Sequence, residues 1–80
     1  MNKPLPTKPT LETGKYQHYK GNEYEVIDLA LHSETEEWMV VYRPLYGEGY
    51  LWVRPYEMFS EKVTLADGSQ VGRFKKVQKG

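Results

Sequence analysis

Residues His32 to Thr35 bring an imidazole, two hydroxyls and a carboxylate into one short segment, His-Ser-Glu-Thr. Such a set could activate a serine for nucleophilic attack, with histidine as the general base. The spacing argues against this chemistry, because adjacent residues of an extended chain point to opposite sides and Ser33 cannot easily give its proton to His32. We expect instead a strand-ending turn in which Ser33 or Thr35 bonds the backbone. A small enzyme centred on His32 and Glu34 is the least favoured function.

The same polar pair, His32 and Glu34, could share one face and reach a metal ion, and His18 with Glu25 could form a second pair. Structural zinc sites usually have four protein ligands at characteristic sequence spacings, and most of these ligands are cysteine or histidine. This chain has two histidines and no cysteine. We therefore predict hydrogen-bonded or solvated histidines, no metal and no cofactor.

A recognition surface is better supported, because seven of the eleven aromatic residues lie between Trp38 and Phe59. Gly47-Glu48-Gly49 suits a three-residue hairpin loop, in which glycine supplies the left-handed backbone. Tyr46 then faces Tyr50, and alternation along each strand separates aliphatic from aromatic side chains. The aliphatic face, which we predict to be core, contains Met39, Val41, Leu45, Leu51 and Val53; the other contains Trp38, Val40, Tyr42, Tyr46, Tyr50, Trp52 and Arg54.

This aromatic face has two interpretations. A small barrel or a partner segment could cover both sides of the hairpin, or the rings could form a platform for a ligand. Arg54 could stack on rings or bind a carboxylate or phosphate, and its ordinary role would be an ion pair with Glu57. Pro44 weakens the register, because proline cannot donate to a ladder and a slip of one residue exchanges the faces.

The elements that must position these residues are short strands. Strands are predicted at Gly14 to Tyr19 and Glu23 to Leu31, joined by a two-residue turn at Gly21-Asn22 that pairs Tyr19 with Tyr24. The apolar positions change face within the second strand. This change predicts a bulge near Asp28 that turns the strand into a second sheet.

Later segments continue the pattern of short elements. A strand restarts at Met39, and Pro55 to Phe59 could form one helical turn with proline at its first position. Ala66 to Ser69 is a turn between strands near Val63 to Leu65 and Gln70 to Phe74. The prediction is an all-β fold, a small SH3-like barrel or roll of five to six short antiparallel strands with one short helical turn.

Three regions are expected along the chain. Residues 1–13 carry three of the five prolines and are predicted to be a flexible leader, residues 14–77 a single β domain, and residues 78–80 a frayed tail. Within the leader, Pro6-Thr7-Lys8-Pro9 has the spacing of a polyproline ligand for aromatic grooves. The ordinary interpretation of this short segment is an inert tail.

Length and composition limit the classes of function. A chain of 80 residues buries only about 60 to 65% of its unfolded surface, so one small core is expected and no deep catalytic cavity. The absence of cysteine fits a reducing cytoplasm, and no apolar run approaches the roughly 20 residues needed to cross a bilayer. Eleven basic and eleven acidic residues give a formal charge of zero, which removes the general attraction to nucleic acid. We expect a soluble, cytoplasmic, non-enzymatic protein.

The sequence from Gly14 to about Phe74 resembles the bacterial domain-of-unknown-function family sixteen-fifty-three. The shared pieces are Tyr-Lys-Gly-Asn at residues 19–22, Tyr24 and Val26, His-Ser-Glu-Thr at 32–35, Val40 to Glu48, Leu51 to Pro55, Met58-Phe59, and a late Asp-Gly turn before Arg73-Phe74. The resemblance implies a small stand-alone bacterial domain with an SH3-like fold and no activity that can be carried over. One departure is Gly72, where the family pattern leads us to expect proline, so a looser final strand is expected.

These observations favour a binding module. The expected partner is a peptide or protein segment, and the expected contacts are the rings with Arg54 for charge selectivity. The alternative is a single-stranded nucleic-acid-binding module, supported by aromatic residues and a basic end. No membrane association is expected, and the chain is predicted to be a monomer or a weak dimer formed through an open strand edge. The predicted ligand-binding residues are Tyr42, Tyr46, Tyr50, Trp52 and Arg54.

Overall fold

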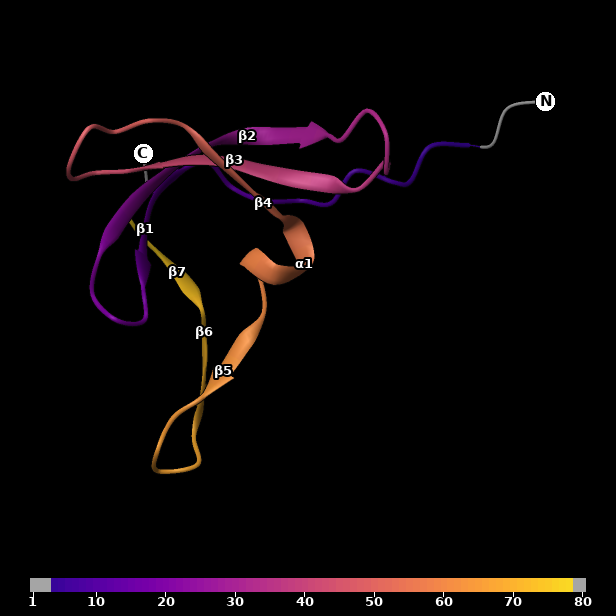
Figure 1. The fold of residues 1–80 in the computed structure, drawn as a ribbon. Coiled ribbons are helices and arrows are strands. Elements are labelled where there is room, and N and C mark those ends of the chain that lie inside the picture. Colours follow the sequence, from indigo (N-terminus) through magenta and orange to yellow (C-terminus); the bar gives the residue numbers. More distant parts are fainter. Residues whose placement is uncertain (1–3, 79–80) are drawn as a thin grey trace.

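The computed structural model describes residues 4–78, which form seven strands and one helical turn in two antiparallel sheets. The larger sheet has the order β4-β3-β2-β1-β7, and β5 and β6 form the smaller one (Figure 1). The elements are β1 (Gly14–His18), β2 (Glu23–Leu31), β3 (Trp38–Pro44), β4 (Trp52–Pro55), α1 (Tyr56–Phe59), β5 (Lys62–Thr64), β6 (Gln70–Gly72) and β7 (Phe74–Gln78). The predicted all-β class and the helical turn are confirmed. Of the two predicted forms, barrel and roll, a closed barrel is not formed within residues 4–78.

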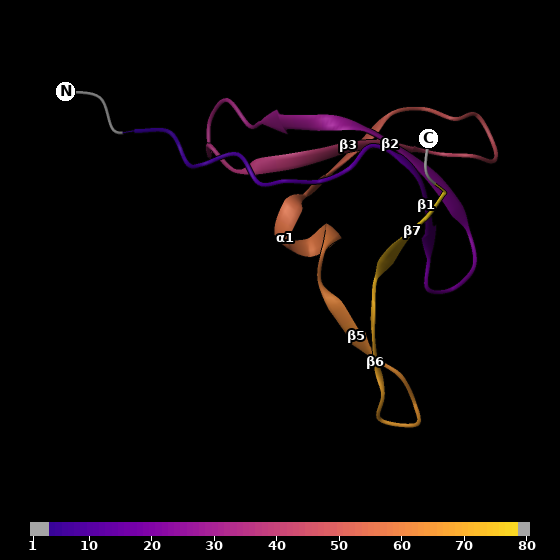
Figure 2. The same ribbon diagram turned by 180° about the vertical axis from the view of Figure 1, so that it is seen from behind.

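The core is small and mainly aromatic. Figures 1 and 2 show α1 on one side of the curved sheet, and Phe59 of α1 belongs to the core cluster. Phe59 of α1 stacks on Phe74 of β7, with ring centroids 4.2 Å apart and an angle of 3° between the planes. The buried apolar residues within 4–78 are Tyr16, Tyr24, Val26, Val40, Tyr42 and Phe59.

The predicted assignment of the two hairpin faces is wrong for the aliphatic positions and for Val40 and Tyr42, whereas Tyr46, Tyr50 and Trp52 are exposed as expected. Val40 and Tyr42, placed on the outer aromatic face, are 0% and 2% exposed, whereas Val53, placed in the core, is 60% exposed. Leu45 and Leu51 are also exposed, and Met39 and Val41 are half-buried. The reason is that α1 and β7 cover the aromatic face, and burying a ring removes more apolar surface from water than burying a valine.

The register of the β3–β4 hairpin also differs from the prediction. Tyr42 pairs with Trp52, so the connection spans residues 45–51 instead of three residues. The shift is an even number of residues, and the two residues remain on one face. Gly47 and Gly49 do adopt positive φ angles, of 64° and 72°. The loop is longer because Tyr46 bonds to Tyr24, phenol oxygen to phenol oxygen at 3.1 Å, instead of pairing with Tyr50.

The β1–β2 turn is likewise longer than predicted. Tyr16, and not Tyr19, pairs with Tyr24, and His18 N–H donates to the carbonyl of Asn22 at 2.7 Å. A two-residue turn of the predicted type needs positive φ at both central residues. Only Gly21 has it, with φ of 114°, because among the described non-glycine residues positive φ occurs at Glu36 alone.

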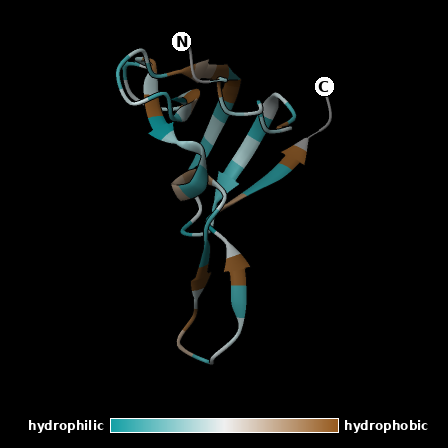
Figure 3. Ribbon diagram, turned by 90° about the vertical axis from the view of Figure 1, so that its right-hand side faces the viewer, coloured by the Kyte–Doolittle hydropathy of each residue, from teal (hydrophilic) through white to brown (hydrophobic). Residues whose placement is uncertain are grey.

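Two local predictions are confirmed, and the first is the bulge in β2. The register of β2 shifts between Val26 and Asp28, so Ile27 is the bulged residue, although both halves of β2 pair with β3 in one sheet. The second is the turn between β5 and β6, which the N–H of Leu65 closes by donating to the carbonyl of Ser69. The prediction that Pro55 takes the first position of the helical turn is wrong, because Pro55 ends β4 and caps α1 with an extended ψ of 140°. The strand predicted over residues 70–74 is interrupted at Arg73, which separates β6 from β7. Figure 3 shows the β5–β6 hairpin projecting away from the larger sheet.

Candidate functional site

The exposed apolar side chains concentrate in the β3–β4 hairpin. Of the eleven large hydrophobic side chains that are exposed within residues 4–78, six come from residues 45–53. Exposed apolar residues that cluster instead of scattering are typical of a surface that another molecule covers. We call this set the hairpin patch; its members are Leu45, Tyr46, Tyr50, Leu51, Trp52 and Val53.

Two rings of the hairpin patch, Trp52 and Tyr46, pack on buried rings. Trp52, 44% exposed, meets Tyr42 edge to face, with centroids 6.0 Å apart and planes at 87°. Its centroid also lies 6.3 Å from that of Tyr24. Tyr46 packs on Tyr24 edge to face, with centroids 5.8 Å apart. Trp52 and Tyr46 are therefore held in place while part of each ring faces water, which lowers the conformational entropy that binding would cost.

Arg54 is half-buried beside these rings. Its Nε donates to the Tyr42 phenol oxygen at 3.1 Å, and its Cζ lies 5.8 Å from the centre of the Phe74 ring. Instead of the predicted ion pair with Glu57, Arg54 forms a hydrogen bond to a tyrosine and a cation–π contact. The arginine closes one side of the aromatic cluster and keeps a charge next to it.

Four of the five predicted ligand-binding residues thus lie together: Tyr42, Tyr46, Trp52 and Arg54. Tyr42 is the buried support of this group, not an exposed member. Tyr50 lies in the loop and is 69% exposed. Sequence reasoning missed Tyr24 and Phe74, which come from β2 and β7 and join the cluster only through the sheet order.

Tyr24 carries a shifted ionisation. Burial, followed by the hydrogen bond and the nearby phenol of Tyr46, raises the pKa of Tyr24 from 10.0 to about 12. We predict that Tyr46→Phe lowers the pKa of Tyr24 but leaves it above 10.0, because burial remains. Between pH 10 and pH 12 the unfolded chain loses this proton first, so folding stability falls as pH rises through that window. NMR of the tyrosine ring carbons during a pH titration measures the pKa of Tyr24 in the original chain and in the variant. A Tyr24 pKa that is the same in both would contradict the hydrogen bond to Tyr46.

The His-Ser-Glu-Thr segment is a structural turn. Nδ1 of His32 accepts the backbone N–H groups of Glu34 and Thr35, at 3.1 and 3.2 Å. The hydroxyl of Thr35 accepts the N–H of Glu37 at 3.2 Å, which confirms a backbone bond from one of the two predicted hydroxyls. One of the two ring nitrogens of His32 is therefore engaged by the chain itself. Glu34 is exposed.

The second polar pair is not brought together. His18 accepts the N–H of Lys20 through Nδ1 at 3.2 Å, and Glu25 forms an ion pair with Arg43 at 2.9 Å. No group of three histidine, cysteine or acidic side chains suited to a metal ion occurs among residues 4–78. In that same range, no helix has the length and apolar character required to cross a membrane.

Together, the open sheet and the hairpin patch define a small all-β domain with a candidate recognition surface. The family model for proteins of unknown function called DUF1653 matches residues 14–76, and the chain belongs to this family. It is similar to a DUF1653 protein from Bordetella bronchiseptica known from its crystal structure, at 35% sequence identity and a TM-score of 0.75. The similarity covers 84% of this chain and 87% of that one. None of the curated proteins matches the chain.

Proposed function

We propose that this protein is a non-enzymatic binding module that takes an extended peptide or protein segment at the hairpin patch. The concentration of exposed apolar side chains in residues 45–53 is the observation that supports this function. Tyrosine and tryptophan are the residues that most often dominate binding energy at protein interfaces. Tyr46, Tyr50 and Trp52 are the proposed anchors, with Tyr42 and Arg54 as their supports.

The position of β4 suits an extended partner. β4 ends the larger sheet and pairs with β3 only, so within the described sheet its other edge has no neighbouring strand. A peptide can add to such an edge by backbone hydrogen bonds while alternate side chains contact exposed residues. Trp52 and Val53 are both exposed on this strand, one on each face.

Replacing Trp52 tests the proposal. Peptides selected from a phage-displayed random library against the full chain serve as probes. In Trp52→Ala we expect their affinity to fall about 10- to 100-fold, because the central ring of the patch is lost. Calorimetry or fluorescence anisotropy measures the change. The substitution also costs about 1 to 2 kcal/mol of stability, because about half of this ring is buried.

Two further variants separate binding from folding. Tyr50→Ala changes stability by under about 0.5 kcal/mol because the ring is exposed, yet it should weaken the same peptides. Tyr19→Ala removes another exposed tyrosine, in the β1–β2 turn outside the patch, and should leave affinity unchanged. Peptides that bind a folded Trp52→Ala protein and Tyr50→Ala as tightly as the original would refute the proposed site.

Single-stranded nucleic acid is the second candidate. Burial, followed by the nearby Arg73, Lys20 and Arg54, lowers the pKa of His18, so several basic groups gather close to the aromatic cluster. Rings beside cations are typical of single-strand binding. A labelled oligothymidine tests this candidate, because its binding should weaken steeply as salt rises. Absence of oligothymidine binding at low salt would eliminate it.

A further inference from the structure

The segment before β1 lies against the domain at a second aromatic surface. Residues 4–13 have no regular secondary structure and run beside β3 on the side where α1 lies (Figures 1 and 2). Leu11 packs against the core, and the carbonyl of Glu12 accepts the Tyr16 phenol at 2.8 Å. These contacts fix the end of the segment that is nearest to β1.

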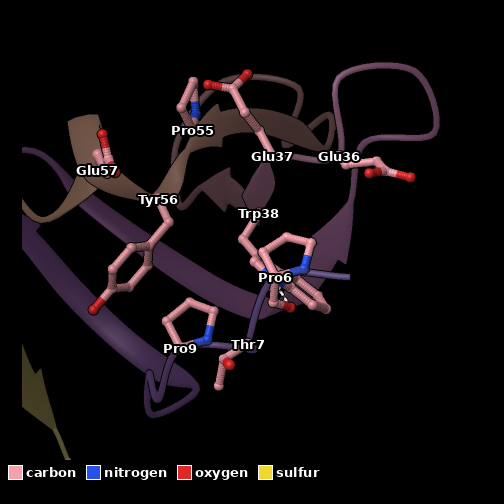
Figure 4. Close-up of a pocket in the computed structure, with 9 residues that line it drawn as sticks. All are labelled: Pro6, Thr7, Pro9, Glu36, Glu37, Trp38, Pro55, Tyr56 and Glu57. Carbon is pink, nitrogen blue, oxygen red and sulfur yellow. Dashed lines mark hydrogen bonds between the residues drawn. The ribbon is translucent and has the colours of Figure 1, made fainter. Parts of the chain in front are cut away.

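Further toward the N-terminus, the segment lines a groove that we call the leader groove. Its wall is made by Trp38 of β3, Pro55 of β4 and Tyr56 of α1. Glu36, Glu37 and Glu57 also line it, with their carboxylates directed away from Pro6 and Pro9 (Figure 4). Pro6, Thr7 and Pro9 line the other side. Figure 4 shows Pro6 over Trp38 and Pro9 on the side of Tyr56.

One polar contact and one charge contact hold the segment at Trp38. The indole Nε1 donates to the carbonyl oxygen of Pro6 at 3.1 Å, and Nζ of Lys8 lies 6.0 Å from the centre of the indole ring. A backbone carbonyl at Pro6 and a cation at Lys8 are thus both recognised by one tryptophan. Since neither contact uses an apolar side chain of the segment, they favour a ligand chosen by backbone shape and charge.

The segment has the conformational properties of a polyproline ligand. Pro6 and Pro9 have fixed φ angles, and Leu5 and Lys8 are restricted to extended conformations because a proline follows each of them. A polyproline helix has three residues per turn, so Pro6 and Pro9 fall on the same side. Its carbonyls have no internal partners, which leaves that of Pro6 free to accept the indole hydrogen. Little conformational entropy is lost when such a segment binds.

We propose that the leader groove is a binding site for a Pro-x-x-Pro segment of another protein that carries a lysine or arginine next to the second proline. The chain's own Pro6-Thr7-Lys8-Pro9 occupies the groove as an intramolecular competitor. A groove lined by aromatic rings is the feature of polyproline recognition. The observed contact of a basic side chain is that of Lys8 with the Trp38 ring, and the three acidic residues around the groove favour a positively charged ligand. The groove retains a cavity of about 340 Å³, which leaves room for bulkier ligand side chains than those of the leader.

This site is separate from the hairpin patch. Trp38 begins β3, whereas Trp52 pairs with Tyr42, four residues and roughly 13 Å further along that strand. The two tryptophans therefore belong to different parts of the hairpin, although Val53 of the patch lies two residues from Pro55 of the groove. The inference therefore does not depend on the proposed function of the hairpin patch. The three glutamates also lie at the groove, away from the patch.

The test uses the full chain and a fluorescent peptide with the sequence of residues 4–13 as the probe. Pro6→Ala combined with Pro9→Ala should release the leader and raise the apparent affinity for this peptide about tenfold, because a site occupied nine-tenths of the time shows a tenfold weaker apparent affinity. Thr10→Ala combined with Thr13→Ala changes the leader outside the groove and should bind as the original chain does. Fluorescence anisotropy measures all three affinities.

Groove variants in the released chain locate the bound peptide. Trp38→Phe keeps a ring but removes the indole hydrogen and should abolish most of the gain. Glu36→Gln combined with Glu57→Gln changes exposed side chains, so folding is retained, and should weaken binding and reduce its salt dependence. Released chain that binds the peptide no better than the original, or binding untouched by both groove variants, would overturn the proposal. Dimerisation of the original chain that the proline substitutions abolish would overturn it too, by making the occupant a second copy.

Discussion

Phe59→Ala should destabilise the domain by about 3 to 5 kcal/mol. The ring is 2% exposed, stacks on Phe74, and meets Tyr16 and Tyr42 edge to face at 5.6 and 5.5 Å. Through these three rings Phe59 connects α1 to β1, β3 and β7. A domain of this size has a total stability on the order of 5 kcal/mol, so the variant should be largely unfolded at physiological temperature. Urea titration followed by circular dichroism measures the loss.

Met58→Ala is the matched control for Phe59. Met58 is the preceding residue of the same helical turn, and its side chain is half exposed. We expect this variant to lose less than about 1 kcal/mol, because surface positions without a special contact tolerate truncation. Equal losses in the two variants would show that α1 does not cover the sheet as described.

Tyr42→Ala is expected to cost a similar amount, about 3 to 5 kcal/mol, because its ring is 2% exposed. The ring contacts Tyr24 at 5.6 Å, Trp52 at 6.0 Å and Phe74 at 5.9 Å. Removing it would leave a cavity under Trp52 and disturb the hairpin patch indirectly. Thermal and urea unfolding give the size of the loss.

Tyr42→Phe isolates the phenol oxygen. The ring remains, but Nε of Arg54 loses its acceptor, so a smaller loss of about 1 to 2 kcal/mol is expected. Tyr50→Phe makes the same chemical change at an exposed site and should have no measurable effect. If Tyr42→Ala proves as mild as Tyr50→Phe, then Tyr42 is a surface residue and the description of the core is incorrect.

Local features of the fold could be predicted because their causes are local. Proline interrupts a strand and precedes a helical turn, as Pro55 does one residue earlier than predicted, and glycine tolerates the positive φ that Gly47, Gly49 and Gly68 adopt. The bulge at Ile27 is visible as a change of apolar face along a single strand. None of these predictions depends on distant residues.

The orientation of the hairpin could not be predicted, because both of its faces are apolar. The face that becomes core is decided by Phe59 and Phe74. These residues come later in the sequence and pack against the side with Val40 and Tyr42. The predicted register of the β3–β4 hairpin was wrong for a similar reason. The bond between Tyr46 and Tyr24 joins residues 22 positions apart, and it competes with the short loop that the glycines alone would allow.

The candidate sites were likewise predictable only where they depend on neighbouring residues. The sequence indicates exposed rings in the hairpin and a ligand-like Pro-x-x-Pro segment in the leader, because both are patterns of neighbouring residues. The surface that accepts the segment combines Trp38 with Pro55 and Tyr56, and these come together only through the pairing of β3 with β4. His32 was a candidate for chemistry by residue type, and its use within the turn follows from backbone geometry.

The two tryptophans of the chain allow the proposed peptide-binding surface at the hairpin patch to be tested in one spectrum. Trp52 lies in the hairpin patch and Trp38 in the leader groove, so each indole N–H signal reports one surface. The ¹⁵N-labelled chain is titrated with a peptide selected as described above that lacks proline, and both signals are followed. We expect the signals of Trp52 and of residues 45–53 to move while that of Trp38 stays in place. Movement confined to Trp38, with Trp52 unchanged at saturating peptide, would contradict the proposed surface.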